Sequence, residues 1–227
     1  MNGERNFKAK YVSDETIENS AAHLLVELGL FPQKPGTINV EVICDKKWFA
    51  PEEYIPLEDG IMGRALFSVM GIQQIEINAT LCDDRTETGR RRIRSTLAHE
   101  IGHAILHEQQ WIGYLQEATA PQLFSEVKPV KNGFECREQD ILGQQPSDYA
   151  EVQANKFMAA LLLPKKLVLE LVGDDIRDFD AFGSASKASW QEEMIRSVAQ
   201  TFDVSWKMAE IRLKKVMPTE HWELALK

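Results

Sequence analysis

The stretch from Ser95 to His107, STLAHEIGHAILH, contains three of the five histidines in this chain of 227 residues. On an α-helix, His99 and His103 lie one turn apart on the same face and can aim two imidazole nitrogens at one ion. Glu100 flanks that ion, where a carboxylate can act as general base on a metal-bound water. Because zinc binds imidazole nitrogen well, we expect a catalytic zinc site with His99 and His103 as ligands and Glu100 as base.

A catalytic zinc site takes a third protein ligand, and Glu151 is the best candidate. It lies on the apolar side of a later predicted helix, where a carboxylate needs a partner such as a metal ion. The alternative is a capping box in which Asp148 and Glu151 only satisfy backbone groups, and Asp148 is also the reserve ligand. His107 lies roughly 12 Å from His99 along a straight helix, so we expect a structural or hydrogen-bonding role for it.

Three helices are predicted to carry or support these residues. The first covers SDETIENSAAHLLVELGL, with a start signal at Ser13 and Asp14 and a stop at Gly29. The second begins at Arg90 and holds the histidines beside an apolar stripe with a period of 3.6 residues. The third covers SDYAEVQANKFMAALLLP and ends at Pro164.

A small sheet is expected before the histidine helix. Residues 38–44 alternate apolar and polar side chains, and ALFSV and IEINA alternate more weakly around a turn at Gly71. Residues 108–147 have no clear period apart from possible short helical pieces around IGYLQEA and CREQDILG. We interpret them as a long irregular connection. Helices combined with a small sheet predict an α+β fold class.

The chain becomes polar and rich in Gly and Ser past Leu171, which predicts a boundary between a domain of residues 1–172 and a C-terminal segment of residues 173–227. Two short helices with N-caps at Ser189 and Ser205 are expected there, in the shape of a helix-turn-helix. Residues 189–217 carry five basic and four acidic side chains, a net charge of +1, which is thin support for DNA binding. Docking on the first domain or holding a protein substrate is favoured.

Composition is typical of a globular protein, with 44% hydrophobic and 27% charged residues. The formal net charge of -9 argues against binding nucleic acid through the overall field. No apolar run is long enough to span a bilayer, and three widely spaced cysteines (Cys44, Cys82, Cys136) do not form a disulfide framework. We therefore expect a cytoplasmic protein that does not interact with membranes.

Three segments resemble the ImmA/IrrE type of zinc metallopeptidases: TLAHEIGHAILH, the preceding strand IEIN, and EVQANKFMAALLLP, which is similar to the family's Glu-x-x-Ala-Asn-x-Phe-Ala-x-x-Leu-Leu-x-Pro segment. The likeness covers roughly residues 14–166. It implies a zincin-like core, in which a small sheet packs on the active-site helix, and Zn²⁺ held by His99, His103 and Glu151 with Glu100 as catalytic base. It also implies a cytoplasmic protease that cleaves helix-turn-helix repressors.

The sequence departs from the family pattern in two ways. The connection between the two motifs is longer than usual, and Met158 stands where the family commonly has Ala. In related enzymes an edge strand binds the substrate backbone, and Ile75 to Ala79 is the expected edge here. Tyr149 and Tyr114 are open candidates for a group that stabilises the oxyanion.

The leading hypothesis is a zinc-dependent endopeptidase that cuts a protein partner, a helix-turn-helix repressor, with Glu100 as the base. The alternative is a non-proteolytic transcriptional regulator or toxin–antitoxin component. In that case the zinc fold is a scaffold, and the C-terminal helices bind DNA or a repressor. A Glu100→Gln variant that keeps its partner but loses cleavage distinguishes the first hypothesis from the second.

Overall fold

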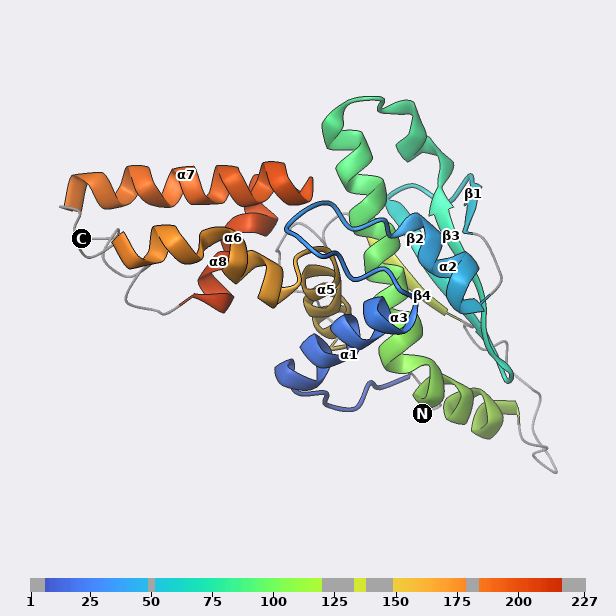
Figure 1. Ribbon diagram of the computed structural model, residues 1–227. Helices are drawn as coiled ribbons and strands as arrows, with labels where there is room; N and C mark the ends of the chain where they lie inside the picture. Colours follow the sequence, from blue (N-terminus) through green and yellow to red (C-terminus); the bar gives the residue numbers. More distant parts are fainter. Residues whose placement is uncertain (1–6, 49–51, 120–132, 138–148, 179–183, 218–227) are drawn as a thin grey trace, which may run out of the picture. The chain divides into compact units, whose positions relative to one another are not determined.

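The computed structural model describes residues 7–48, 52–119, 133–137, 149–178 and 184–217 (Figure 1). Over these ranges the chain has an α+β architecture of seven α-helices, one 3₁₀ helix and four strands. The helices are α1 (Asp14–Glu27), α2 (Glu41–Trp48), α3 (Glu87–Thr119), α5 (Tyr149–Leu162), α6 (Lys165–Asp178), α7 (Ser184–Phe202) and α8 (Trp206–Val216). The strands are β1 (Glu53–Ile55), β2 (Ile61–Ser68), β3 (Gly71–Asn78) and β4 (Gly133–Arg137), and the 3₁₀ helix is η1 (Ala79–Asp83).

The chain divides into two compact units. The first consists of residues 1–20 and 40–158, and the second of residues 21–39 and 159–227. The first unit contains the sheet, α2, α3 and most of α5, whereas the second contains α6, α7 and α8. The sequence-based boundary between residues 172 and 173 stays a prediction.

The four strands form one sheet in the order β1-β3-β2-β4. β2 and β3, the strands expected on either side of a turn at Gly71, pair antiparallel. β4 pairs antiparallel with β2, and β1 pairs parallel with β3. The expectation that Ile75 to Ala79 forms the sheet edge is wrong, because β3 lies between β1 and β2. In the described part of the sheet, the two edges are β1 and β4.

Helix α3 packs against β2, β3 and β4 and carries the histidine segment across the sheet (Figure 1). The helix predicted from Arg90 is confirmed, and so is a helical piece around IGYLQEA. The irregular connection expected from residue 108 is wrong over its first part, because α3 continues to Thr119. The buried Trp111 and Leu115 follow His107 at intervals of four residues and prolong the apolar face. Neither α3 nor another described helix is long and apolar enough to cross a membrane.

Strand β4 has no counterpart in the sequence prediction, which expected a short helical piece over CREQDILG. The first two residues of CREQDILG, Cys136 and Arg137, belong to β4, and the rest of this segment lies outside the described residues. Along β4, Phe134 and Cys136 are buried while Glu135 is partly exposed. This alternation covers only five residues, too few for the strand period to be recognised without its pairing partner β2.

Helix α2 replaces the strand predicted over residues 38–44. Val40, Ile43 and Cys44 are all buried, and their spacing places them on one face of a helix. Glu41 in the first turn and basic residues in the last turn suit the helix dipole. The strand prediction fails because a short apolar segment can satisfy both the strand period and the helix period.

The helices predicted around residues 13–29 and 147–164 are confirmed as α1 and α5. In α1 the buried side chains share the expected stripe: Ile17, Ala21, Leu24 and Leu25. Helix α5 ends at Leu162, two residues before Pro164, whose ring cannot continue a helix.

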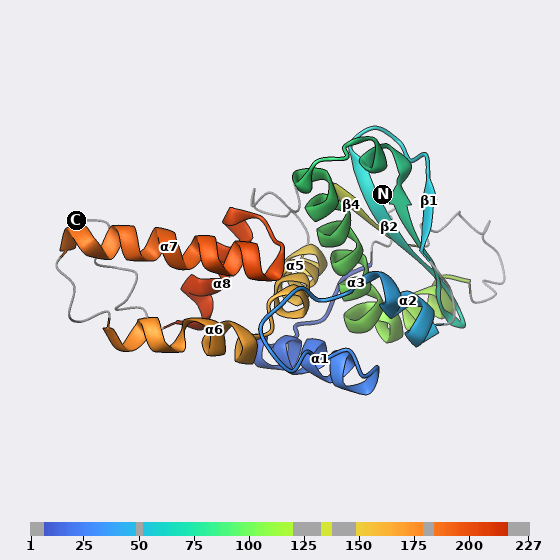
Figure 2. The same cartoon turned by 45° about the horizontal axis from the view of Figure 1, so that its top comes forward.

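In the second unit, α6, α7 and α8 pack on one another (Figure 2). Helix α7 begins at Ser184, so the N-cap expected at Ser189 is wrong. The N-cap at Ser205 is confirmed, because its side chain accepts a hydrogen bond from the backbone N–H of Met208. Arg212 of α8 is buried and donates a hydrogen bond from Nε to the backbone oxygen of Leu163 over 2.8 Å.

Candidate metal centre

Helix α3 lies between the sheet and α5, so its middle turns are in the interior of the first unit (Figures 1 and 2). His99, Glu100 and His103 are 0% exposed, and Glu151 of α5 is 8% exposed. Gly102 allows the two helices to approach closely, since a Cβ at this position would lie 3.2 Å from a backbone oxygen of α5. Four polar side chains are therefore buried together, which is unfavourable unless hydrogen bonds or a ligand compensate.

Three side chains of α3 and α5 direct atoms that can bind a metal ion toward one another. His99 Nε2 lies 2.9 Å from Glu151 Oε2 and 3.0 Å from His103 Nε2, and His103 Nε2 lies 3.3 Å from Glu151 Oε1. Ligands at 2.0–2.1 Å from a tetrahedral zinc are about 3.3 Å apart, so these separations suit one shared ion. The structure brings the three residues together, and their role as zinc ligands stays a prediction.

The other ring nitrogen of His99 fixes which tautomer this side chain adopts. Nδ1 of His99 lies 3.0 Å from Oδ1 of Asn155, and an amide oxygen can only accept a hydrogen bond. Because Nδ1 therefore carries the hydrogen, Nε2 of His99 presents its lone pair toward Glu151. Asn155 follows Glu151 by one turn, so α5 supplies both a candidate ligand and the group that orients another.

A chain of hydrogen bonds fixes the tautomer of His103 in the same way. Gln153 donates from Nε2 to the backbone oxygen of Lys10 over 2.9 Å, which turns its Oε1 toward Nε2 of His107, 3.3 Å away. Burial, followed by the nearby His103, lowers the pKa of His107 to about 3, so its ring is neutral. His107 then carries its hydrogen on Nε2 and accepts at Nδ1 from Nδ1–H of His103, 3.2 Å away. Nε2 of His103 is left with its lone pair.

These tautomers direct two lone pairs at a carboxylate. Burial alone would raise the pKa of Glu151, but the charge and hydrogen bonds of His103, together with His99, hold this pKa well below its usual range. With both imidazoles neutral, three acceptor atoms converge here. Either a proton on an imidazole, which is what holds the pKa of Glu151 low, or a bound cation relieves this arrangement. Two neutral imidazoles and one carboxylate are a donor set that zinc binds, so the residues present fit this ion.

Glu100 points from α3 toward the sheet. Gly63 of β2 leaves room for it, because a Cβ there would lie 3.2 Å from Oε1 of Glu100 and 2.6 Å from the Thr96 methyl carbon. Burial raises the pKa of Glu100 well above its usual value, the charge of Glu151 raises it further, and the backbone N–H of Ala65 opposes them. Among the described residues, neither carboxylate oxygen of Glu100 has a hydrogen-bond partner within ordinary geometry.

Strand β4 contributes a thiol and an aromatic ring to the same side of α3. Cys136 pairs with Gly63 in the strand register and is 0% exposed. Its Sγ lies within 4.8 Å of a carboxylate oxygen of Glu100 and of a ring nitrogen of His99. Phe134 stacks on the ring of His103, with centroids 4.0 Å apart and an interplanar angle of 14°.

The remaining candidates from the sequence have other surroundings. Tyr149 is 46% exposed and stacks on Tyr11, and Tyr114 packs edge-on against Phe7. Asp148, the reserve ligand, lies outside the described residues. His107 has the hydrogen-bonding role that the sequence analysis expected.

Several residues around the candidate metal centre were not singled out from the sequence. Gln153 and Asn155 lie in the same segment as Glu151, and their amide side chains on a largely buried helix are a signal for hydrogen bonding to the candidate ligands. Gly63 and Cys136 gave no comparable signal. Their importance depends on strand pairing that brings residues 73 positions apart into register.

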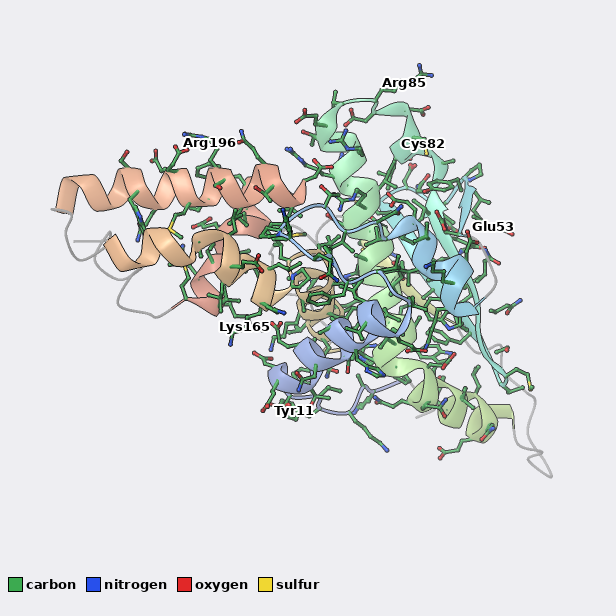
Figure 3. All side chains as sticks on the ribbon, in the orientation of Figure 1. Tyr11, Glu53, Cys82, Arg85, Lys165 and Arg196 are labelled. Carbon is green, nitrogen blue, oxygen red and sulfur yellow. The ribbon has the colours of Figure 1, made fainter. Side chains whose placement is uncertain are left out.

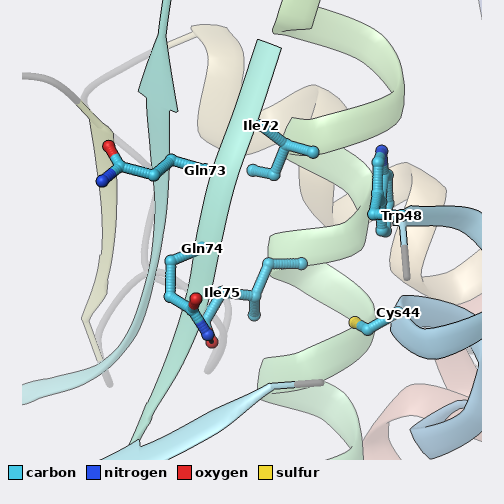
Figure 4. A pocket seen from close by; sticks show the side chains of 6 residues that line it. All are labelled: Cys44, Trp48, Ile72, Gln73, Gln74 and Ile75. Atoms are coloured by element: carbon cyan, nitrogen blue, oxygen red, sulfur yellow. Dashed lines mark hydrogen bonds between the residues drawn. The ribbon is translucent and has the colours of Figure 1, made fainter. Parts of the chain in front are cut away.

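A separate small pocket of about 170 Å³ lies between α2 and β3 (Figure 4). Its lining is Cys44, Trp48, Ile72, Gln73, Gln74 and Ile75. In Figure 4 the two isoleucines point toward the cysteine and the tryptophan. None of these residues belongs to the cluster of His99, His103 and Glu151, so the pocket is distinct from the candidate metal centre.

Comparison with known proteins gives one result for the family. A family model described as the IrrE N-terminal-like domain, Peptidase_M78, matches residues 84–214, which is more than half of the chain. No curated protein matches the chain. The matched range includes all four residues predicted for the site: His99, Glu100, His103 and Glu151.

Proposed function

The chain belongs to the IrrE N-terminal-like peptidase family, and we propose that it is a cytoplasmic zinc-dependent endopeptidase that cleaves a protein partner. One observation carries this proposal. A fully buried carboxylate, Glu100, has an oxygen within 4.8 Å of a ring nitrogen of His99, one of the three candidate ligands, and has no hydrogen-bond partner among the described residues. A carboxyl group kept in this state is costly for the fold, and such groups are concentrated at catalytic sites.

Zinc, when bound by His99, His103 and Glu151, lowers the pKa of a water molecule and polarises the carbonyl of the peptide bond. Glu100 accepts the proton of the attacking water and then gives it to the leaving amine. Its raised pKa suits both steps, because a base with a pKa closer to neutrality can also return the proton. The neutral, hydrogen-bonded imidazoles keep their Nε2 atoms available as ligands throughout.

The substrate is proposed to bind as an extended strand along β4, whose outer edge is an edge of the described sheet. Cys136 of β4 lies beside Glu100, so a peptide in this position has its backbone close to the base. The proposed substrate-binding edge is therefore Gly133–Arg137. It replaces the segment from Ile75 to Ala79, which the sequence suggested and which lies inside the sheet.

The proposed partner is a helix-turn-helix repressor, as the family resemblance implies, and the C-terminal helices are proposed to hold it. The charges of α7 and α8 do not favour the DNA-binding alternative. Residues 189–217 have five basic and four acidic side chains, and Arg212 is buried. Four basic and four acidic side chains therefore remain that could face a nucleic acid. Three of the remaining basic groups form ion pairs with acidic neighbours on the same helix: Arg196, Lys207 and Lys214 (Arg196 is labelled in Figure 3).

The test uses a Glu100→Gln variant and a control, Glu117→Gln, on the exposed part of the same helix. The Glu100 variant is expected to keep stoichiometric zinc, to capture the partner on co-purification, and to lose cleavage of the captured protein. The control is expected to behave as the parent does. The proposal is wrong if Glu100→Gln releases the repressed promoter as well as the parent chain.

A further inference from the structure

We propose that Cys136 is a fourth protein ligand of the metal and that its thiolate closes the site in a latent form of the protein. The thiolate takes the coordination position that a water molecule or a substrate carbonyl otherwise needs. On binding, the sulfur forms a bond to the ion and its proton is released to solvent. This inference rests on the proposed metal site, and it adds a regulatory state to it.

The strand register places the thiol on the same face of the sheet as the Glu100 carboxylate. Cys136 of β4 is opposite Gly63 of β2, and paired residues of neighbouring strands point to the same face of a sheet. The Glu100 carboxylate lies against Gly63 on that face, and Sγ of Cys136 is within 4.8 Å of Glu100 and of His99. Nitrogen at about 2.0 Å and sulfur at about 2.3 Å from a tetrahedral zinc are about 3.5 Å apart, so the sulfur has to move toward His99, His103 and Glu151 before this bond can form.

The Glu100 carboxylate is a second and independent indication of a ligand at this position. It is 0% exposed, both of its oxygens lack a hydrogen-bond partner among the described residues, and one of them lies within 4.8 Å of the thiol. A catalytic zinc keeps one position open to water. Among the described residues, the sulfur of Cys136 is the metal-binding atom that is grouped with this carboxylate and with His99.

Comparison with Cys44 shows that a buried cysteine need not have these surroundings. Cys44 lies among Trp48, Ile72 and Ile75 in the pocket of Figure 4. Burial, with the charges of nearby acidic residues, raises the pKa of Cys44 to about 12, so it stays a neutral thiol. Within the described residues, the cysteine that falls in a possible metal-binding group is Cys136.

Two spectroscopic measurements on the full chain test the proposal. X-ray absorption of the zinc-loaded protein is expected to show one sulfur scatterer at about 2.3 Å together with nitrogen and oxygen. Replacement of zinc by Co²⁺ is expected to give a sulfur-to-cobalt charge-transfer band in the near ultraviolet. This band should vanish in Cys136→Ala, with cobalt still stoichiometric. It should persist in Cys82→Ala, which removes an exposed cysteine (labelled in Figure 3), and in Cys44→Ala.

A binding measurement tests whether the thiolate closes the site. Acetohydroxamate, a small zinc-binding anion, is expected to bind zinc-loaded Cys136→Ala at least about tenfold more tightly than the parent. A tenfold difference corresponds to an open zinc coordination position in about one parent molecule in ten. Equal affinities would overturn the latent state.

The outcomes separate this inference from the proposed function. A fully zinc-loaded parent with only nitrogen and oxygen scatterers overturns the role of Cys136 and leaves the metal site intact. A parent that binds no stoichiometric metal overturns both. Because the absorption measurement uses the parent protein, it decides the question even if Cys136→Ala fails to fold.

Discussion

The two sides of the histidine segment of α3 differ in how their polar groups are satisfied. Toward α5, His99 and His103 each have a partner for the ring nitrogen that does not face Glu151, namely Asn155 and His107. Toward the sheet, buried polar atoms of Thr96, Glu100 and Trp111 have no hydrogen-bond partner within the described residues. The same helix therefore has a satisfied side and an unsatisfied side.

The difference suggests a division of labour. Hydrogen bonds on the α5 side fix the tautomers and directions of the candidate ligands, which is what a metal site needs in order to bind one ion tightly. On the sheet side, each unsatisfied buried group costs about 1–3 kcal/mol of stability. Buried polar groups without hydrogen-bond partners are concentrated at catalytic sites, which agrees with the role proposed for Glu100.

Loss of a ligand on the satisfied side is the largest expected effect. Glu151→Ala removes the carboxylate between the two histidines and is expected to weaken zinc binding by more than about 100-fold, beyond the loss typical of an outer hydrogen-bonding partner. Metal content after dialysis, measured by mass spectrometry, gives the result, with Glu117→Ala as control. Stoichiometric zinc in the variant would shift the third ligand to Asp148 or His107.

The hydrogen-bond chain behind His103 predicts a smaller effect. His107→Phe removes the acceptor for Nδ1–H of His103 and is expected to weaken zinc binding about 10–100-fold. His107→Gln keeps an oxygen acceptor and should restore much of the affinity. Competition with a chromophoric chelator measures both, and His23→Phe, an exposed histidine, is the control. If the phenylalanine variant bound zinc like the parent, the chain would be only structural.

Two glycines test the sheet side. Gly63→Ala places a methyl group against Thr96 and Glu100 and is expected to destabilise the metal-free protein by about 1–3 kcal/mol in urea unfolding. It should also lower kcat, because Glu100 must move. Gly113→Ala, within α3 and with no atom within 4 Å of the new Cβ, should instead stabilise by about 0.5–1 kcal/mol. Similar responses from both variants would remove the evidence for tight packing at Gly63.

The smallest effect expected is the pH dependence caused by Glu100. Its pKa is raised in the folded chain, so folding binds a proton, and the stability of the metal-free parent falls as pH rises above the ordinary value of 4.5. Glu100→Gln should therefore be more stable than the parent at pH 8, by on the order of 1 kcal/mol. The difference should shrink as pH falls to 4.5. A constant difference across this range would contradict the raised pKa.

What the sequence predicted well depends on local spacing. The histidine helix and α5 follow from a 3.6-residue period, and their motifs named the cluster that the structure brings together. Strand β4 and the environment of Cys136 depend on pairing with β2, a contact between distant residues that no local pattern reports. The strand predicted over residues 38–44 is wrong because this short segment fits both the strand period and the helix period.

The bond between Gln153 and the backbone of Lys10 has a practical consequence for anyone who alters the start of the chain. Trimming residues 7–10 would free the Gln153 amide to rotate, and His107 could then exchange the positions of its hydrogen and its lone pair. Nδ1 of His107 would then carry a hydrogen, so it could no longer accept the hydrogen bond from Nδ1–H of His103. The metal affinity would thus report whether Lys10, 93 residues before His103, is in contact with Gln153. Zinc titrations of truncated and intact chains would measure this difference.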